Sequence, residues 1–156
     1  MISPWYTRFS SALAALLLIA TTSQALDPDL RKQILDAVRP PAAAKAGQPV
    51  LIRVDRLNVD KDWAVLVGSL VSTSGTELDW NKAKDCHPDL DKMLWAVVHR
   101  TGTTWKIQQL DICACEPPYW GLSLTQLTWP CGVYEGLSDG GVTNLADQCR
   151  LQHRKK

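Results

Sequence analysis

The sequence predicts an α+β fold in which an N-terminal helix packs on an antiparallel sheet of four or more strands. Three observations predict it. Apolar residues recur at helical spacing after residue 27, alternation with a period of two begins at residue 50, and two strand pairs follow in succession. A helix followed by strand hairpins favours a helix that lies across one face of the sheet.

The predicted helix begins after Asp27, whose side chain can cap it, with Pro28 at a first helical position that needs no N–H donor. Apolar side chains then fall on one face, at Leu30, Ile34, Ala37 and Val38. Pro40 and Pro41 are predicted to end the helix, because the residue before a proline is pushed out of the α region. The stretch PPAAAKAGQP is expected to be a stiff linker.

The strands follow in two hairpins. The first pair is predicted at 50–57 and 63–71, and the second strand of this pair is apolar on both faces, which is typical of a central strand. A polar segment at 72–92 is too long for a simple turn. The second pair is predicted at 93–100 and 104–112, around a turn at 101–103. This element order is cystatin-like or NTF2-like.

The rest of the chain is predicted to be an irregular, disulfide-stapled region. Residues 116–121 are expected to form a loop because they contain Pro117 and Pro118, and residues 122–127 are expected to form a short strand. One or two helical turns are predicted at 143–151, capped by Thr143.

Residues 1–25 are predicted to be a signal peptide. Arg8 precedes a short apolar run, and Ser23-Gln24-Ala25 provides the small-x-small pattern that signal peptidase accepts. Cleavage near Ala25 would leave 131 of the 156 residues as a single globular domain, residues 26–156, in the periplasm or secreted. No second long apolar run is present, so no stable membrane anchor is expected.

The predicted mature domain is neutral. Arg8 is the one charged residue of the signal peptide, so its removal leaves 16 basic and 16 acidic residues. A dedicated nucleic-acid binder normally carries a strongly basic face, and this class is therefore not expected. The basic end, residues 150–156, is predicted to be a frayed and solvated terminus.

The five cysteines are predicted to form two structural disulfides, as is usual in an oxidising compartment, with one thiol left over. Cys113 and Cys115 are two residues apart, so a bond between them would close a strained ring. The pairs expected are Cys131–Cys149 and Cys86 with either Cys113 or Cys115.

Three functional hypotheses for the cysteines are less favoured than structural disulfides. Cys113 and Cys115 could form a redox site, although they lack the CxxC spacing. The same pair with Cys131 or His99 could hold Cu(I) or Zn(II). A Cys–His hydrolase could use Cys86 or another thiol with His87 or His99, but a nucleophile motif is missing from the sequence. We therefore assign no catalytic residue and expect no metal or cofactor.

Two loose groups of aspartates occur in predicted connections. A glycosidase or calcium site could use such carboxylates, but aspartate also favours turns through local hydrogen bonds. Solvated loop charge is the favoured interpretation for both groups, which are Asp55, Asp60 and Asp62, and Asp85, Asp89 and Asp91.

Seven tryptophans accompany a single phenylalanine. Those in predicted strands are expected in the core, namely Trp63, Trp95 and Trp105. Aromatic residues in loops are enriched at recognition surfaces, and they can equally cover the open end of a sheet. The candidate partner-binding residues are Trp80, Tyr119, Trp120 and Trp129.

From Leu30 to Ile112 the order of these patterns resembles a loose group of small exported bacterial proteins. The shared features are a short helix, a strand, a Trp-Ala-Val strand such as Trp63–Val65, and a hairpin with a tryptophan in its second strand. The resemblance implies an α+β fold and no activity, and the cysteine-rich region after Ile112 departs from it.

The leading functional hypothesis is a non-enzymatic exported binding protein, such as an inhibitor or immunity-type protein that acts on a cell-envelope enzyme. The alternatives are a small-ligand carrier that uses the concave face of the sheet, and a thiol-based redox enzyme that uses Cys113 and Cys115. The sequence does not indicate the oligomeric state.

Overall fold

Four antiparallel strands form one sheet in the order β1-β2-β3-β4, which is the predicted succession of two hairpins. The computed structural model describes residues 26–87, 89, 91–124, 127–141 and 143–154, and the predicted signal peptide, residues 1–25, lies outside them. The strands are Leu51–Asp60 (β1), Trp63–Val71 (β2), Met93–Thr101 (β3) and Thr104–Ala114 (β4). The α+β class and the four-stranded sheet are therefore confirmed.

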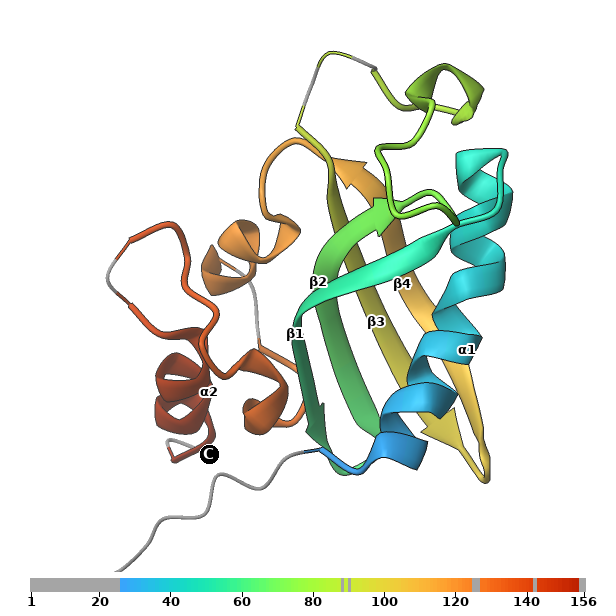
Figure 1. Ribbon diagram of the computed structural model, residues 1–156. Coiled ribbons are helices and arrows are strands. Elements are labelled where there is room, and N and C mark those ends of the chain that lie inside the picture. The colour runs from blue at the N-terminus through green and yellow to red at the C-terminus, as the bar shows by residue number, and fades with distance from the viewer. Residues whose placement is uncertain (1–25, 88, 90, 125–126, 142, 155–156) are drawn as a thin grey trace, which may run out of the picture.

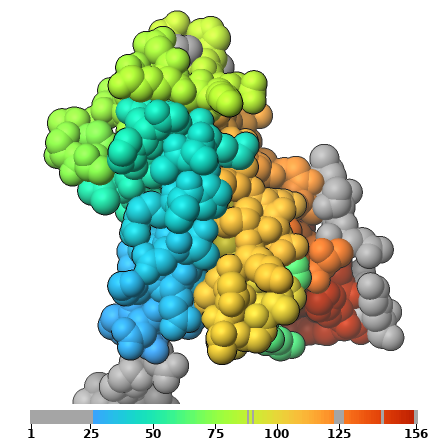
Figure 2. Space-filling model, turned by 90° about the vertical axis from the view of Figure 1, so that its right-hand side faces the viewer, coloured from blue at the N-terminus to red at the C-terminus, as the bar shows by residue number. Residues whose placement is uncertain are grey.

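The two inner strands carry the core on both of their faces. β2 and β3 each have a run of five buried residues, which explains why β2 is apolar on both sides. One layer on the sheet is α1 (Pro28–Ala46), and the other is the C-terminal region (Figure 1). In Figure 2, α1 and β4 lie side by side on one surface of the molecule.

The prediction that the first helix ends at Pro40 is wrong. α1 runs through both prolines and ends at Ala46, before Gly47 in the left-handed conformation with φ of 66°. A proline inside a helix removes a backbone hydrogen bond and costs about 3 kcal/mol. The buried stripe offsets this cost because it continues at four-residue spacing beyond the prolines, through Ile34, Val38, Ala42 and Ala46.

The other face of the sheet is covered by the described residues of the segment 118–154 (118–124, 127–141 and 143–154), here called the C-terminal layer. This layer contains two short 3₁₀ helices and one α helix, namely η2 (Pro118–Leu124), η3 (Cys131–Tyr134) and α2 (Leu145–Arg154). Its apolar side chains form a second core with the facing residues of β2 and β3, and the fully buried members include Val65, Val97, Val133 and Leu145.

The sequence predictions for the C-terminal layer need three corrections. Residues 118–124 form a 3₁₀ helix, in place of the loop and short strand predicted there. The final helix begins at Leu145. Its cap is Asn144 and not Thr143, because the Asn144 side chain accepts a hydrogen bond of 2.9 Å from the backbone N–H of Ala146. The basic end up to Arg154 is helical and not frayed.

Polar contacts fasten the C-terminal layer to the edge strand β1. The side-chain amide of Asn58 donates to the carbonyl oxygens of Val133 and Glu135, at 3.0 and 2.7 Å. The Asp60 carboxylate accepts a hydrogen bond of 2.8 Å from the Gly132 N–H. These bonds position η3 against one edge of the sheet. Among the described residues, no helix combines the length and the apolar character needed to cross a bilayer.

Gly68 allows β1 to approach β2 closely, and its replacement by alanine tests this packing. A Cβ at Gly68 would lie 2.1 Å from the backbone carbonyl oxygen of Arg53, beside the register shift between Val54 and Arg56. Because the obstacle is backbone, β1 has to move, and we expect Gly68→Ala to lower the free energy of unfolding by about 2–3 kcal/mol. Urea denaturation measures this loss.

Gly121→Ala is the control for that measurement, because a Cβ there meets nothing within 4 Å. We expect it to change the free energy of unfolding by no more than about 0.5 kcal/mol. Equal losses for the two variants would show that the close approach at Gly68 does not limit stability.

Candidate functional site

A chain of aromatic rings joins the sheet to the C-terminal layer. The ring of Trp129 is its centre, with centroids 6.0 Å from Trp63, 6.5 Å from Trp95 and 5.7 Å from Tyr134. The Trp95 ring also contacts Tyr119 at 5.6 Å. Each such ring pair contributes about 0.5–1.5 kcal/mol beyond the area it buries. Tyr119, Trp129 and Tyr134 are therefore packed to the strand tryptophans through ring contacts.

Tyr134 is the most deeply buried ring of this aromatic chain. It is 1% exposed, and its hydroxyl oxygen accepts a hydrogen bond of 3.2 Å from the backbone N–H of Trp129. Burial raises the pKa of the Tyr134 phenol, because the ionised form would lose its hydration. The bond orients the backbone that carries Trp129.

Trp120 is the aromatic side chain that this layer presents to solvent. Among the described residues, the large apolar side chains that are exposed are Leu51, Trp120 and Leu151, with Leu51 and Trp120 each 42% exposed. The Trp120 ring passes so close to Gly140 that a Cβ there would lie 3.3 Å from a ring atom. The turn below it is anchored, because Asp139 accepts hydrogen bonds from Gly141 and Gln148.

The four candidate partner-binding residues do not all gather in one place. Tyr119, Trp120 and Trp129 belong to the C-terminal layer, where Tyr119 and Trp129 are half-buried. Trp80 lies in η1 (Trp80–Lys82), is 6% exposed, and packs in the core on the α1 side. The Lys92 ammonium stands 5.4 Å from its ring centroid. Trp80 therefore covers the sheet, which is the other role considered for the loop tryptophans.

Two of the three strand tryptophans lie in the core, as expected, and His99 lies beside the third. Trp95 and Trp105 are buried, on opposite faces of the sheet, and Trp63 is half-buried. The imidazole of His99 packs on the Trp63 ring with a centroid distance of 4.3 Å. A stacking role for His99 accounts for its position beside the aromatic chain.

Two disulfides staple the molecule. Cys131–Cys149, the pair that the sequence predicts, joins η3 to α2, and Cys86–Cys113 joins the long polar segment to β4. The choice left open for Cys86 is thus decided in favour of Cys113. Cys115 is the free and exposed thiol among the described residues. A bridge to Cys86 is possible for Cys113 because β4 carries it to the core on the α1 side, where Cys86 also packs.

This pairing removes the Cys113/Cys115 dithiol and the Cys86 thiol that the functional hypotheses name, and it leaves Cys115 as a free thiol. Cys113 and Cys115 do not form a dithiol, because Cys113 is bonded to Cys86. Cys86 is likewise not available as a nucleophile for His87, whose Nδ1 accepts a hydrogen bond from the Asp89 N–H at 3.3 Å.

Two aspartates of the first acidic group, Asp60 and Asp62, have structural partners. Asp60 binds the Gly132 N–H, and Asp62 accepts hydrogen bonds of 3.0 and 2.8 Å from the guanidinium of Arg100. Asp60 is the last residue of β1 and is half-buried, so the interpretation as solvated loop charge is wrong for it, whereas Asp62 is exposed in the turn that follows.

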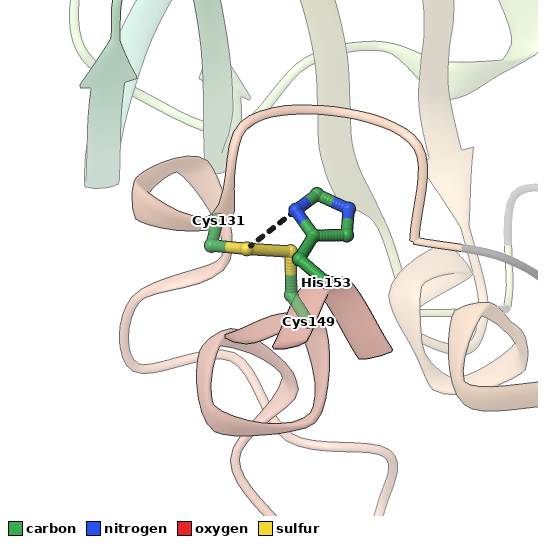
Figure 3. Close-up of side chains that lie close together, drawn as sticks. All are labelled: Cys131, Cys149 and His153. Atoms are coloured by element: carbon green, nitrogen blue, oxygen red, sulfur yellow. Dashed lines mark hydrogen bonds between the residues drawn. A yellow bond between two sulfur atoms is a disulfide. The ribbon is translucent and has the colours of Figure 1, made fainter. Parts of the chain in front are cut away.

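Among the described residues, one group of side chains could hold a metal ion, and the sequence does not predict it. It consists of Cys131, Cys149 and His153, whose donor atoms all lie within 4.8 Å of one another (Figure 3). The signal in the sequence is the spacing of Cys149 and His153, four residues apart at the end of a helix.

The described residues leave no open sheet face for a small ligand, because α1 covers one face and the C-terminal layer the other (Figure 1). A depression of about 370 Å³ lies instead beside the last residues of β2, at the end of the β1–β2 hairpin that is opposite its turn. Charged residues line it, including Arg53, Glu77 and Asp91. A carrier would need this polar depression, and not the concave face considered from the sequence.

Comparison of the chain with protein-family models, with curated proteins and with solved structures finds no match. The geometry of the site is therefore the basis for any assignment of function.

Proposed function

We propose that this protein is an exported, non-enzymatic binding protein that recognises a protein of the cell envelope through Trp120, in the manner of an inhibitor or immunity protein. The observation that carries the proposal is the exposed indole of Trp120, which is 42% exposed and lies against the turn at Gly140. Tryptophan is enriched among the residues that carry the binding energy of protein interfaces, so an exposed tryptophan is a candidate recognition residue.

The support beneath Trp120 favours recognition over incidental exposure. The ring stands on the turn at Gly140, which Asp139 and Gln148 tie to α2, and Cys131–Cys149 links α2 to η3. Tryptophan loses little conformational entropy on binding, and a preorganised ring loses still less. A partner could therefore gain the full contact area of the indole.

Export is supported by the two disulfides and by the pattern of residues 1–25. Disulfides persist in oxidising compartments, and they are rare where thiols are kept reduced. Cleavage near Ala25 would deliver a neutral domain to the periplasm or the exterior. An envelope enzyme is the kind of partner that such a small, rigid domain can meet there.

The test compares Trp120→Ala with Leu51→Ala. The two side chains are each 42% exposed, and Trp120 lies in the C-terminal layer whereas Leu51 lies on β1. The wild-type domain, immobilised on resin, should capture a stoichiometric partner from envelope extract. We expect Trp120→Ala to weaken this complex by about 30-fold or more, the scale of a binding hot spot. Leu51→Ala should bind within about twofold of wild type. Isothermal titration with the purified partner measures both affinities.

Thermal melting separates recognition from packing. Trp120→Ala should leave the melting temperature within about 2 °C of wild type, as for a surface substitution. A strong loss of stability with unchanged affinity would instead assign Trp120 to the cover of the sheet and refute the proposal.

A further inference from the structure

Cys131, Cys149 and His153 form a cluster that the proposed binding function does not use. Figure 3 shows the imidazole of His153 beside the disulfide, with its Nδ1 3.7 Å from the Sγ of Cys131. All three donor atoms lie within 4.8 Å of one another. Two sulfurs and one imidazole are a donor set that Zn²⁺ prefers.

The fold brings these donors together from two segments. Cys149 and His153 are four residues apart on α2, so their side chains share one face of the helix. Cys131 is the first residue of η3, and the next residue, Gly132, is held by the Asp60 carboxylate of β1. The cluster therefore lies where α2 meets an anchored turn.

The spacing of the imidazole already suits a metal. Zinc binds sulfur at about 2.3 Å and imidazole nitrogen at about 2.0 Å, so a tetrahedral site separates sulfur from nitrogen by about 3.5 Å. The observed 3.7 Å between His153 Nδ1 and Cys131 Sγ is close to this value. The two sulfurs, in contrast, are bonded to each other, whereas two zinc-bound thiolates stand about 3.8 Å apart.

We propose that reduction of Cys131–Cys149 opens a Cys₂His site that binds one Zn²⁺ ion. A dithiol reductant supplies two electrons and two protons, so the S–S bond breaks, two thiols form, and the reductant becomes a disulfide. Zinc then displaces the two thiol protons and binds both thiolates together with the neutral His153 imidazole. A water molecule completes the tetrahedron. The disulfide state keeps the site closed, because both sulfurs are committed to each other.

Noncovalent contacts keep the donors together after the bond is broken. The Leu145 N–H donates to the Leu137 carbonyl at 2.9 Å, and Arg150 forms an ion pair with Glu135 across the two segments. Leu145, Ala146 and Val133 are fully buried in the same core. η3 and α2 are thus held in place by more than the disulfide.

The cluster is also open to an ion and a reductant on one side. His153 is exposed and Cys131 is half-buried, whereas Cys149 is fully buried. A reductant can reach Cys131 first, and the resulting site would have one shielded thiolate and an accessible imidazole.

The experiment measures metal binding to the full chain before and after reduction with a phosphine. Zinc content after desalting gives the stoichiometry, and Co²⁺ absorption reports thiolate ligands. We expect less than about 0.1 zinc per oxidised chain and one per reduced chain, since a disulfide sulfur is not a thiolate ligand. The near-ultraviolet circular dichroism of the reduced chain should stay native-like. Zinc held by an unfolded reduced chain would overturn the proposal.

Two histidine variants identify the ligand set. His153→Ala retains both cysteines, and we expect it to lower the zinc affinity of the reduced chain at least tenfold. His87→Ala removes an exposed histidine beside Cys86, and should leave the affinity unchanged. The double variant Cys131→Ser/Cys149→Ser should lose the site. Binding that survives His153→Ala and the double variant would place the metal on Cys86, Cys113 and Cys115, and the proposal would be wrong.

Discussion

Replacing Trp95 with alanine should lower the free energy of unfolding by about 3–5 kcal/mol, the range for removal of a buried tryptophan. Trp95 is 2% exposed, and its ring contacts both Tyr119 and Trp129. Its indole N–H also donates a hydrogen bond of 3.2 Å to the Gln109 side chain. The substitution would leave a cavity between β3 and the C-terminal layer. Urea denaturation followed by far-ultraviolet circular dichroism measures the loss.

Trp120→Ala is the matched control, because it deletes the same atoms from an exposed position. We expect Trp120→Ala to lower the free energy of unfolding by about 0.5 kcal/mol. A loss below 1 kcal/mol for Trp95→Ala would mean that the C-terminal layer collapses into the space without penalty, and that the aromatic chain does not couple it to the sheet.

Removing the Cys131–Cys149 disulfide should cost more stability than removing Cys86–Cys113. The pairs are 18 and 27 residues apart, so loop entropy alone predicts about 3.2 and 3.5 kcal/mol, slightly favouring the longer loop. Cys149 is fully buried, however, whereas both members of the other pair are half-buried. Alanine at Cys149 therefore adds a packing defect, which should bring the total to about 4 kcal/mol or more.

The measurement compares Cys131→Ala/Cys149→Ala with Cys86→Ala/Cys113→Ala by urea denaturation at equal protein concentration. Tryptophan fluorescence gives a second signal for the unfolding of each variant. A greater loss for Cys86→Ala/Cys113→Ala would show that chain entropy, and not burial of Cys149, determines the contribution of each disulfide.

The elements built from local contacts are those that the sequence predicts well. The range of β2 matches its prediction at both ends, and the turns at 61–62 and 102–103 follow from local chemistry. Antiparallel hairpins form between neighbours in the chain, so their pattern needs no knowledge of the rest of the fold. The Cys131–Cys149 pair is predictable for a similar reason, since both residues flank one short irregular region.

The end of α1 is decided by packing at a distance. The local rule for Pro40 and Pro41 predicts an early end, but Ala42 and Ala46 are buried against the sheet and extend the helix by another turn and a half. A local conformational preference of about 3 kcal/mol is overcome when the alternative would expose a buried stripe.

The candidate site is only partly predictable. Sequence alone identifies Tyr119, Trp120 and Trp129 as loop aromatics, but it cannot separate them from Trp80, which folds into the core on the α1 side. It also does not reveal that His153 meets Cys131, since that contact joins α2 to η3. Exposure and side-chain proximity depend on which segments cover each face of the sheet.

The sequence by itself determined the α+β class, the meander of four strands and the Cys131–Cys149 disulfide, because hydrophobic period, turns and short-range spacing are local properties. Only the tertiary structure decided which tryptophan faces solvent, which cysteine joins Cys86, and where the prolines lie within α1. The physical reason is that burial is shared between segments far apart in the chain. A sheet with two apolar faces needs two covers, and the second cover is the irregular C-terminal layer that presents Trp120.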